Sequence, residues 1–97
     1  MKYTTKEIAI LVAALNQKNS GDGNPQARTY ALVELADATS AMARMKALSD
    51  DNGEIPDGEY ELEFNTTEKT LILKCLDENQ WMVGDGEFVL SVKEKLN

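Results

Sequence analysis

The chain has 97 residues, a formal net charge of −7, 42% hydrophobic residues and a single cysteine. These values suit one domain with a modest core, and they exclude a largely disordered chain and a scaffold held by internal disulfides. There is no histidine, which removes the commonest general base and the commonest metal ligand, so we expect a protein that is not an enzyme and has no cofactor or metal site.

The charge is unevenly distributed along the chain. Residues 1–49 carry four acidic and six basic side chains, whereas residues 50–97 carry thirteen and four. Acidic proteins repel nucleic acid and attract basic surfaces, so we expect a basic protein partner and no direct binding of nucleic acid. No apolar run approaches the roughly 18 residues that a membrane span needs. Glu7 interrupts the apolar patch near the N-terminus, which argues against a signal peptide and favours a cytoplasmic protein without a membrane partner.

A capping box predicts the start of the first helix. Thr4 precedes Glu7 by three residues, so each side chain can accept a hydrogen bond from a free backbone amide. Apolar residues then recur on one helical face, at Ile8, Leu11, Val12 and Leu15. The glycines of NSGDGNP, Gly21 and Gly23, predict the end of this helix and a turn.

The second helix is predicted to begin with Asn24 as its cap and Pro25 in its first turn, and to extend to about Ser49. A heptad-like seam runs along it, formed by Ala31, Leu35, Ala38, Met42 and Met45. The short connection favours packing of this seam against the first helix. The alternative is a second copy of the chain, which would make it a small self-associating structural or assembly protein.

The second half predicts strands. Tyr60, Leu62 and Phe64 alternate with glutamates, which is typical of a half-buried strand. TLILKCL (70–76) predicts a further strand with a buried Cys75, and WMV (81–83) another. EFVLSVK (87–93) is interpreted as a strand, although its apolar residues also fit a helix face. The expected fold is α+β, a single domain (1–97) in which two N-terminal helices (1–49) pack on a three- to four-stranded antiparallel sheet (50–97).

The stretch DDNGEIPDGEYELEFN (50–65) holds seven carboxylates and no lysine or arginine. On a strand, Glu59, Glu61 and Glu63 would project from one face about 6.7 Å apart, about twice the rise per phosphate along one DNA strand. Two such charges repel by only roughly 0.6 kcal/mol in water, so a merely solvated face is equally compatible with folding. The candidate partner-binding residues are Asp50, Asp51, Glu54, Asp57, Glu59, Glu61 and Glu63, followed further along the chain by Asp77 and Glu78.

Two other features have competing interpretations. The spacing of the acids in DDNGE lacks the alternating pattern of a helix–loop–helix calcium site, so no metal site is expected there. Trp81 is either a core residue or an exposed aromatic anchor beside the acids, since tryptophan is enriched at binding hot spots.

In size, acidity, helices-plus-sheet plan and the acidic block DDNGEIPDGEYELEFN, the chain resembles small phage-encoded anti-CRISPR proteins, in particular those that inhibit type I-F surveillance complexes by imitating duplex DNA. The resemblance implies a non-catalytic inhibitor, monomeric when free, that acts in the cytoplasm of an infected bacterium. Its carboxylates would occupy the lysine- and arginine-lined channel where target DNA enters. The implied partner is therefore a basic nucleic-acid-binding complex built from Cas proteins.

Overall fold

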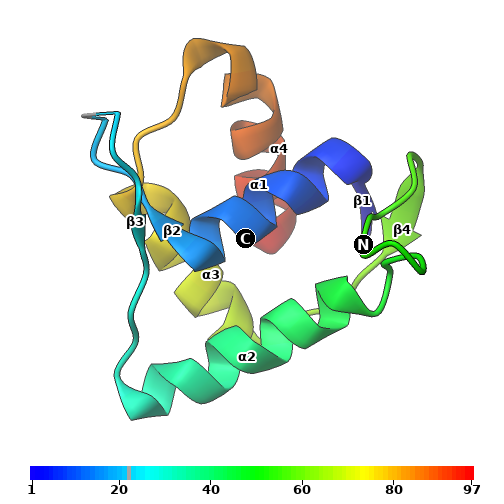
Figure 1. Ribbon diagram of the computed structural model, residues 1–97, viewed down its shortest axis with the longest axis horizontal. Helices are drawn as coiled ribbons and strands as arrows, with labels where there is room; N and C mark the ends of the chain where they lie inside the picture. The colour runs from blue at the N-terminus through cyan, green and yellow to red at the C-terminus, as the bar shows by residue number, and fades with distance from the viewer. Residues whose placement is uncertain (22) are drawn as a thin grey trace.

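Four helices make up most of the fold, and two short antiparallel ribbons lie at opposite ends of it (Figure 1). The computed structural model describes residues 1–21 and 23–97. In chain order the elements are β1 (Lys2–Thr4), α1 (Thr5–Asn16), β2 (Gln17–Lys18), β3 (Gln26–Ala27), α2 (Leu32–Lys46), β4 (Glu59–Glu61), α3 (Thr66–Glu78), the 3₁₀ turn η1 (Val83–Asp85) and α4 (Gly86–Leu96). The fold is thus α+β, as expected, but the predicted three- to four-stranded sheet is wrong.

The predicted start of α1 is confirmed. The Thr4 hydroxyl accepts from the Glu7 amide, and the Glu7 carboxylate accepts from the Thr4 amide at 2.8 Å, so both halves of the capping box are present. The predicted apolar face is buried at Ile8, Leu11 and Leu15. It packs on α3 and α4, which places α1 in the middle of the molecule.

α2 begins at Leu32 instead of near Asn24, and it ends at Lys46 instead of Ser49. The expected first turn is extended because β3 pairs with β2 as an antiparallel hairpin. Gly21 and Gly23 were predicted to end the first helix, but α1 already ends at Asn16. The two glycines adopt φ of 85° and 83° between these strands, and Asp22 between them lies outside the described residues. The cap of α2 is Ala31, whose side chain makes no capping hydrogen bond.

The seam predicted on the second helix faces inward at two of its positions. Ala38 and Met45 are buried, together with Ala41. Internal packing of these residues is therefore confirmed, although α2 packs more extensively on α3 than on α1. Leu35, predicted on the same seam, is instead 44% exposed.

Three of the predicted strands are wrong. Residues 70–76 lie inside α3, residues 87–93 lie inside α4, and residues 81–83 form no strand. In α3 the apolar residues fall on one helical face and are buried, at Leu71, Ile72, Cys75 and Leu76. The burial of Cys75 is confirmed, but on a helix. The helix face that the sequence offered as the alternative for α4 is correct, with Val92 and Leu96 buried.

The alternation around β4 is confirmed. β4 pairs with β1 in the register Lys2 to Glu61, Tyr3 to Tyr60 and Thr4 to Glu59. Beyond the strand, Leu62 and Phe64 continue the buried side, and the Phe64 ring meets Tyr3 edge to face at 6.1 Å. The intervening glutamates are exposed. The strand thus contributes one apolar side to the core and turns its acidic side to solvent.

None of the helices in the described part of the chain has the length and apolar character that crossing a membrane requires.

Candidate acidic binding surface

The loop from Ala47 to Gly58, which joins α2 to β4, carries four of the predicted carboxylates and has a defined internal structure. The Asp50 carboxylate accepts hydrogen bonds from the amides of Asn52 and Glu54 at 2.9 and 3.0 Å, and the Asp50 amide donates to the Glu54 carbonyl at 2.7 Å. Gly53, at φ 77°, supplies the left-handed turn that closes this ring. The loop is therefore ordered by its own short-range hydrogen bonds.

Thr5, the first residue of α1, fastens the far end of the same loop. Its hydroxyl donates to the Pro56 carbonyl at 3.0 Å and accepts from the Gly58 amide at 2.9 Å, while its own amide donates to the Gly58 carbonyl at 3.0 Å. The Tyr60 hydroxyl also donates to the Pro56 carbonyl. These contacts hold Asp57 and the start of β4 against the beginning of α1.

All seven predicted carboxylates between residues 50 and 63 are exposed, and they lie on the loop, β4 and the segment just after it, at one end of the molecule (Figure 1). Five of them form no ion pair with any described residue: Asp50, Asp51, Glu54, Asp57 and Glu59. We call the loop from Ala47 to Gly58 together with β4 and Glu63 the acidic surface.

The remaining two carboxylates of the acidic surface share one cation. The terminal ammonium of Met1 lies 2.6 Å from both Glu61 and Glu63. The hydrogen bonds that the ammonium donates to Glu61 and Glu63 raise the pKa of the ammonium, and the one to Glu63 lowers the pKa of that carboxyl group. The charge of this part of the surface is therefore partly neutralised.

Asp77 and Glu78 lie elsewhere. They end α3, which starts just after β4 and is about 20 Å long at 1.5 Å per residue. Each is neutralised, Asp77 by Lys93 at 3.2 Å and Glu78 by Arg28 at 2.7 Å. The hydrogen bond from Arg28 also lowers the pKa of Glu78. The structure thus separates these two predicted residues from the acidic surface.

Most acidic residues outside the acidic surface are paired with a cation. The paired ones are Glu7, Glu34, Glu68, Asp77, Glu78 and Asp85. Among the described acids outside the surface, Asp37, Glu87 and Glu94 are the exceptions. Unpaired negative charge is therefore more concentrated in the folded chain than the division of the sequence into halves indicates, because the acidic surface holds most of the unpaired carboxylates among the described residues.

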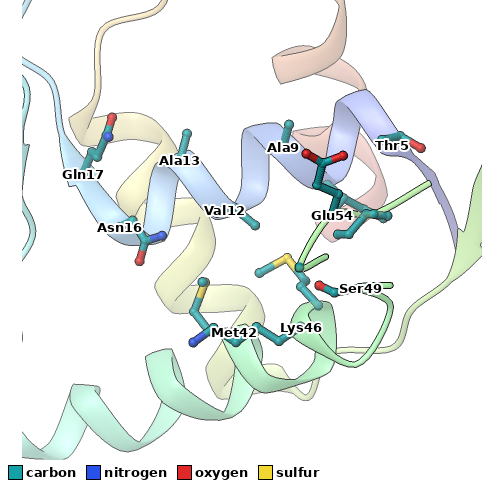
Figure 2. A pocket seen from close by; sticks show the side chains of 14 residues that line it. Thr5, Ala9, Val12, Ala13, Asn16, Gln17, Met42, Lys46, Ser49 and Glu54 are labelled. Carbon is teal, nitrogen blue, oxygen red and sulfur yellow. The ribbon is translucent and has the colours of Figure 1, made fainter. Parts of the chain in front are cut away.

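An open groove of about 720 Å³ lies between α1 and α2, directly beside the acidic surface (Figure 2). Val12 of α1 faces Met42 of α2 across it, and Glu54 of the loop lies at one end. Met45 and Ile55 also line the groove. The lining is chiefly apolar, so the groove can accept an apolar side chain. The sequence did not indicate it, since it predicted Val12 on the core face and Met42 on a packed seam.

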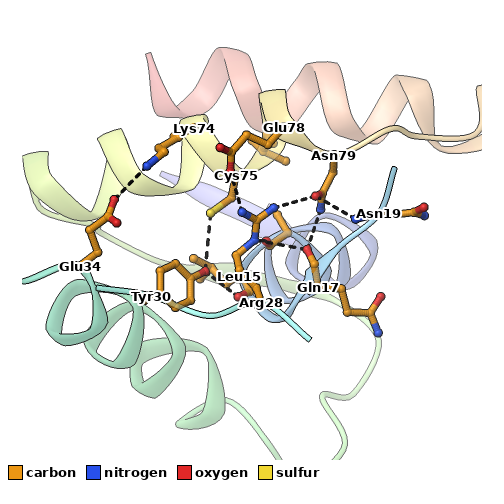
Figure 3. A network of polar contacts seen from close by, with 12 residues as sticks. Leu15, Gln17, Asn19, Arg28, Tyr30, Glu34, Lys74, Cys75, Glu78 and Asn79 are labelled. Atoms are coloured by element: carbon orange, nitrogen blue, oxygen red, sulfur yellow. Dashed lines mark hydrogen bonds and ion pairs between the residues drawn. The ribbon is translucent and has the colours of Figure 1, made fainter. Parts of the chain in front are cut away.

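A polar network at the opposite end of α1 is structural (Figure 3). The Arg28 guanidinium, 7% exposed, donates to the Ala14 carbonyl at 3.1 Å and to Glu78 and Asn79 at 2.7 Å each. Asn79 in turn donates to the Gln17 carbonyl at 2.9 Å. The network ties the hairpin of β2 and β3 to α1 and α3, and it keeps residues 26–30 out of the predicted helix.

Cys75 lies in the core, and Trp81 packs against it. The indole of Trp81 is half-buried against the core and donates to the Leu76 carbonyl at 3.0 Å, which favours the core interpretation over an exposed anchor. Cys75 is a free, buried thiol 3.6 Å from the Tyr30 hydroxyl. Burial raises the pKa of Tyr30, which keeps the hydroxyl protonated, and it donates to the Leu15 carbonyl at 2.6 Å.

Within residues 1–21 and 23–97, no three metal-ligating side chains converge. Comparison of the sequence with known protein families found no match, and comparisons with curated proteins and with solved structures found none either. The chemistry of the acidic surface is therefore the basis for a functional interpretation.

Proposed function

We propose that the chain is a non-catalytic inhibitor that binds a basic nucleic-acid-binding protein, with the acidic surface taking the place of a nucleic-acid backbone. The single observation that carries the proposal is the set of five unpaired carboxylates on one anchored loop and the adjoining strand. The proposed partner is a CRISPR–Cas surveillance complex, which the inhibitor would block by competing with target DNA in the cytoplasm of an infected bacterium.

The order of the loop supports this proposal energetically. Binding costs free energy whenever a loop must be immobilised, at about 0.5–1.5 kcal/mol for each flexible side chain. The loop is already closed by Asp50 and fastened by Thr5, so less of that cost remains. Exposed charges that are not neutralised within the chain also accelerate association with a surface of opposite sign. Both properties suit a competitor for a site that binds a polyanion.

The groove supplies the apolar contact that an acidic surface lacks. Because Glu54 and Ile55 belong both to the loop and to the groove, a partner that covers the loop also reaches the groove. A small number of well-packed apolar anchors usually carries most of the binding energy at a protein interface. We therefore propose that the groove determines which partner is bound and that the carboxylates attract the partner's basic surface.

The test is competition for target DNA on a purified type I-F surveillance complex. The variant Glu54→Gln/Glu59→Gln removes two charges from the acidic surface. Its matched control, Glu87→Gln/Glu94→Gln, makes the same chemical change at two exposed glutamates of α4 that form no ion pair with a described residue. We expect the first variant to inhibit about tenfold more weakly, chiefly through slower association, and the control to inhibit like the unsubstituted protein.

Two results would contradict the proposal in different ways. If the unsubstituted protein fails to displace DNA from the complex, the chosen partner is wrong. If both double variants lose inhibition equally, overall negative charge is responsible and the acidic surface has no special role. Circular dichroism of each variant checks that the fold is retained.

A further inference from the structure

The ribbon of β1 and β4 has two edges, and its register shows which backbone groups point outward. The Leu62 amide donates to the Met1 carbonyl at 3.1 Å, so this pair is hydrogen-bonded. Hydrogen-bonded and non-hydrogen-bonded pairs alternate along an antiparallel ladder, so the pair of Tyr3 and Tyr60, two residues further along each strand, is hydrogen-bonded as well. The residues whose amides and carbonyls point out of the ribbon are Lys2 and Thr4 of β1 and Glu59 and Glu61 of β4.

The outward groups of β1 have partners within the chain. The Thr4 amide donates to the Glu7 carboxylate at 2.8 Å, and the Lys2 carbonyl accepts from the Lys95 ammonium at 2.8 Å. Figure 1 shows β1 on the side of the ribbon that faces the helices. This edge of the ribbon is therefore covered by α1 and α4.

The outward groups of β4 have no such partners. The amides and carbonyls of Glu59 and Glu61 form no hydrogen bond with any residue that the structure describes. β4 lies at the margin of the molecule in Figure 1. An open strand edge of this kind is a template on which an extended segment of another chain can add as a further strand.

We propose that β4 binds an extended basic segment of the partner as a third, antiparallel strand of the ribbon. This inference rests on the proposed function, since it gives part of the acidic surface to the same basic partner. In the new ladder Glu59 and Glu61 occupy hydrogen-bonded positions, so each exchanges two backbone hydrogen bonds with the residue opposite it. The backbone of β4 then holds the segment, and the side chains select its sequence.

The side chains of β4 select basic residues with an apolar residue between them. Glu59 and Glu61 are exposed on one face of the ribbon, and a side chain directly opposite each would lie about 5 Å away. Glu59 forms no ion pair with a described residue, and Glu61 shares the Met1 ammonium with Glu63. Tyr60 is on the other face, half-buried against the core, so the residue opposite it is apolar. The predicted segment therefore reads basic, apolar, basic.

A second copy of the chain does not satisfy this pattern. Antiparallel pairing of two β4 strands would set glutamates directly opposite glutamates, which is destabilising. Lys2, which lies opposite Glu61 within the ribbon, is one strand further from the added strand and does not relieve this repulsion. The charges of the edge thus favour a basic occupant over self-association.

The first test measures binding of a short blocked peptide, acetyl-Thr-Lys-Val-Lys-Thr-amide, by NMR titration of the full chain. In the proposed register the two lysine amides donate to the carbonyls of Glu59 and Glu61, while the valine and threonine amides point away. N-methylation of the two lysines is expected to raise the dissociation constant about tenfold, because two hydrogen bonds are lost. The matched control is N-methylated at the valine and the last threonine, has the same charge, and should bind like the unmethylated peptide.

The second test changes the protein at Glu59, the first residue of β4. Glu59→Pro removes both the charge and the outward amide, whereas Glu59→Gln removes the charge alone. Proline is tolerated at the first residue of a strand and where the amide is not used within the sheet. We expect Glu59→Pro to bind the unmethylated peptide about tenfold more weakly than Glu59→Gln does. Hydrogen exchange of the unsubstituted protein gives a readout without substitution, since saturating peptide should slow exchange of the Glu59 and Glu61 amides about tenfold.

The results separate this inference from the proposed function. Equal binding of the two methylated peptides, absence of peptide binding, or unchanged exchange of the two amides would overturn strand addition. Competition with target DNA could still succeed in each of those cases, through charge alone. Conversely, a chain that binds the peptide as expected but fails to displace DNA would contradict the proposed function and retain strand addition.

Discussion

Glu7 and Glu68 are buried carboxylates whose hydrogen bonds come from several elements at once. Glu68 accepts from the Ser40 hydroxyl at 2.6 Å, from the Asn65 amide at 2.8 Å and from Arg44 at 3.1 Å. Burial opposes ionisation of Glu68, but these hydrogen bonds outweigh it and hold its pKa below the ordinary value. Glu7 is held in the same way by Lys95, Ser91 and the Thr4 amide, and its pKa is likewise lowered.

The substitution Glu68→Gln is predicted to lower the free energy of unfolding at pH 7 by about 2 kcal/mol. The amide keeps the size of the side chain, but it cannot accept charge-assisted hydrogen bonds from Ser40 and Arg44 at both of its polar atoms. Urea unfolding measures the loss. Glu94→Gln, at an exposed glutamate without an ion pair among the described residues, serves as the control and should stay within about 0.5 kcal/mol.

The difference in free energy of unfolding between the unsubstituted protein and Glu68→Gln should also depend on pH, which gives a second test of the same prediction. The pKa of Glu68 is lower in the folded chain than in the unfolded one, so its contribution is fully present above the ordinary value of about 4.3. It is lost as the pH falls through the folded pKa. The stability difference between the two proteins should therefore shrink below about pH 4. A constant difference down to pH 2 would contradict the assignment.

At the level of elements, local capping signals mark the starts of two of the described helices, α1 and α3. The box of Thr4 and Glu7 was predicted and is present. Asn65 and Glu68 form an equivalent box at the start of α3, in the segment that separates two of the predicted strands. The run Leu71–Ile72–Leu73 resembles a buried strand over a short window, and only the spacing to Cys75 and Leu76 shows the helical face.

Asn65→Ala is predicted to lower the free energy of unfolding by about 1 kcal/mol, because the first turn of α3 loses a side-chain acceptor for the Glu68 amide. Denaturant titration gives the value. Asn52→Ala is the matched control, since the Asn52 side chain is exposed and caps no helix. A loss of equal size in both variants would show that the cap at Asn65 contributes nothing of its own.

Other elements depended on partners that are distant in the sequence. The chain at Asn24 and Pro25 carries a proper helix-start signal, yet the segment that follows is extended because β3 pairs with β2 and Arg28 reaches α1 and α3. Sequence periodicity contains no information about such pairing. For the same reason it could not show the groove between α1 and α2.

For the whole molecule, the sequence predicted a concentration of negative charge in the second half of the chain. The structure shows which of the described acidic side chains form no ion pair. Ten basic side chains cannot neutralise seventeen acids. The ion pairs are formed mainly by helices, where Lys and Arg of one element reach Glu or Asp of another. The loop from Ala47 to Gly58 holds none of the basic residues, and no basic side chain of the other described elements forms an ion pair with its carboxylates.

Association with a basic partner is therefore predicted to depend steeply on salt. The association rate constant should fall about tenfold between roughly 0.05 and 0.5 M sodium chloride, because free charges steer encounter only within the screening length. Stopped-flow measurements on the proposed partner, a type I-F surveillance complex, give the dependence of the association rate constant on salt concentration. The association rate constant should depend less steeply on salt concentration for Glu54→Gln/Glu59→Gln than for Glu87→Gln/Glu94→Gln. Identical dependences for the two variants would contradict the prediction.

The hydroxyl of Thr5 bridges the Pro56 carbonyl and the Gly58 amide without contributing any charge. Part of the loop's stiffness is consequently set by an uncharged residue, whereas Asp50 contributes both charge and hydrogen bonds within the loop. Valine, which has the same shape but no hydroxyl, would loosen the tether while every carboxylate stayed in the chain. At this tether the rigidity of the loop can therefore be varied at constant charge.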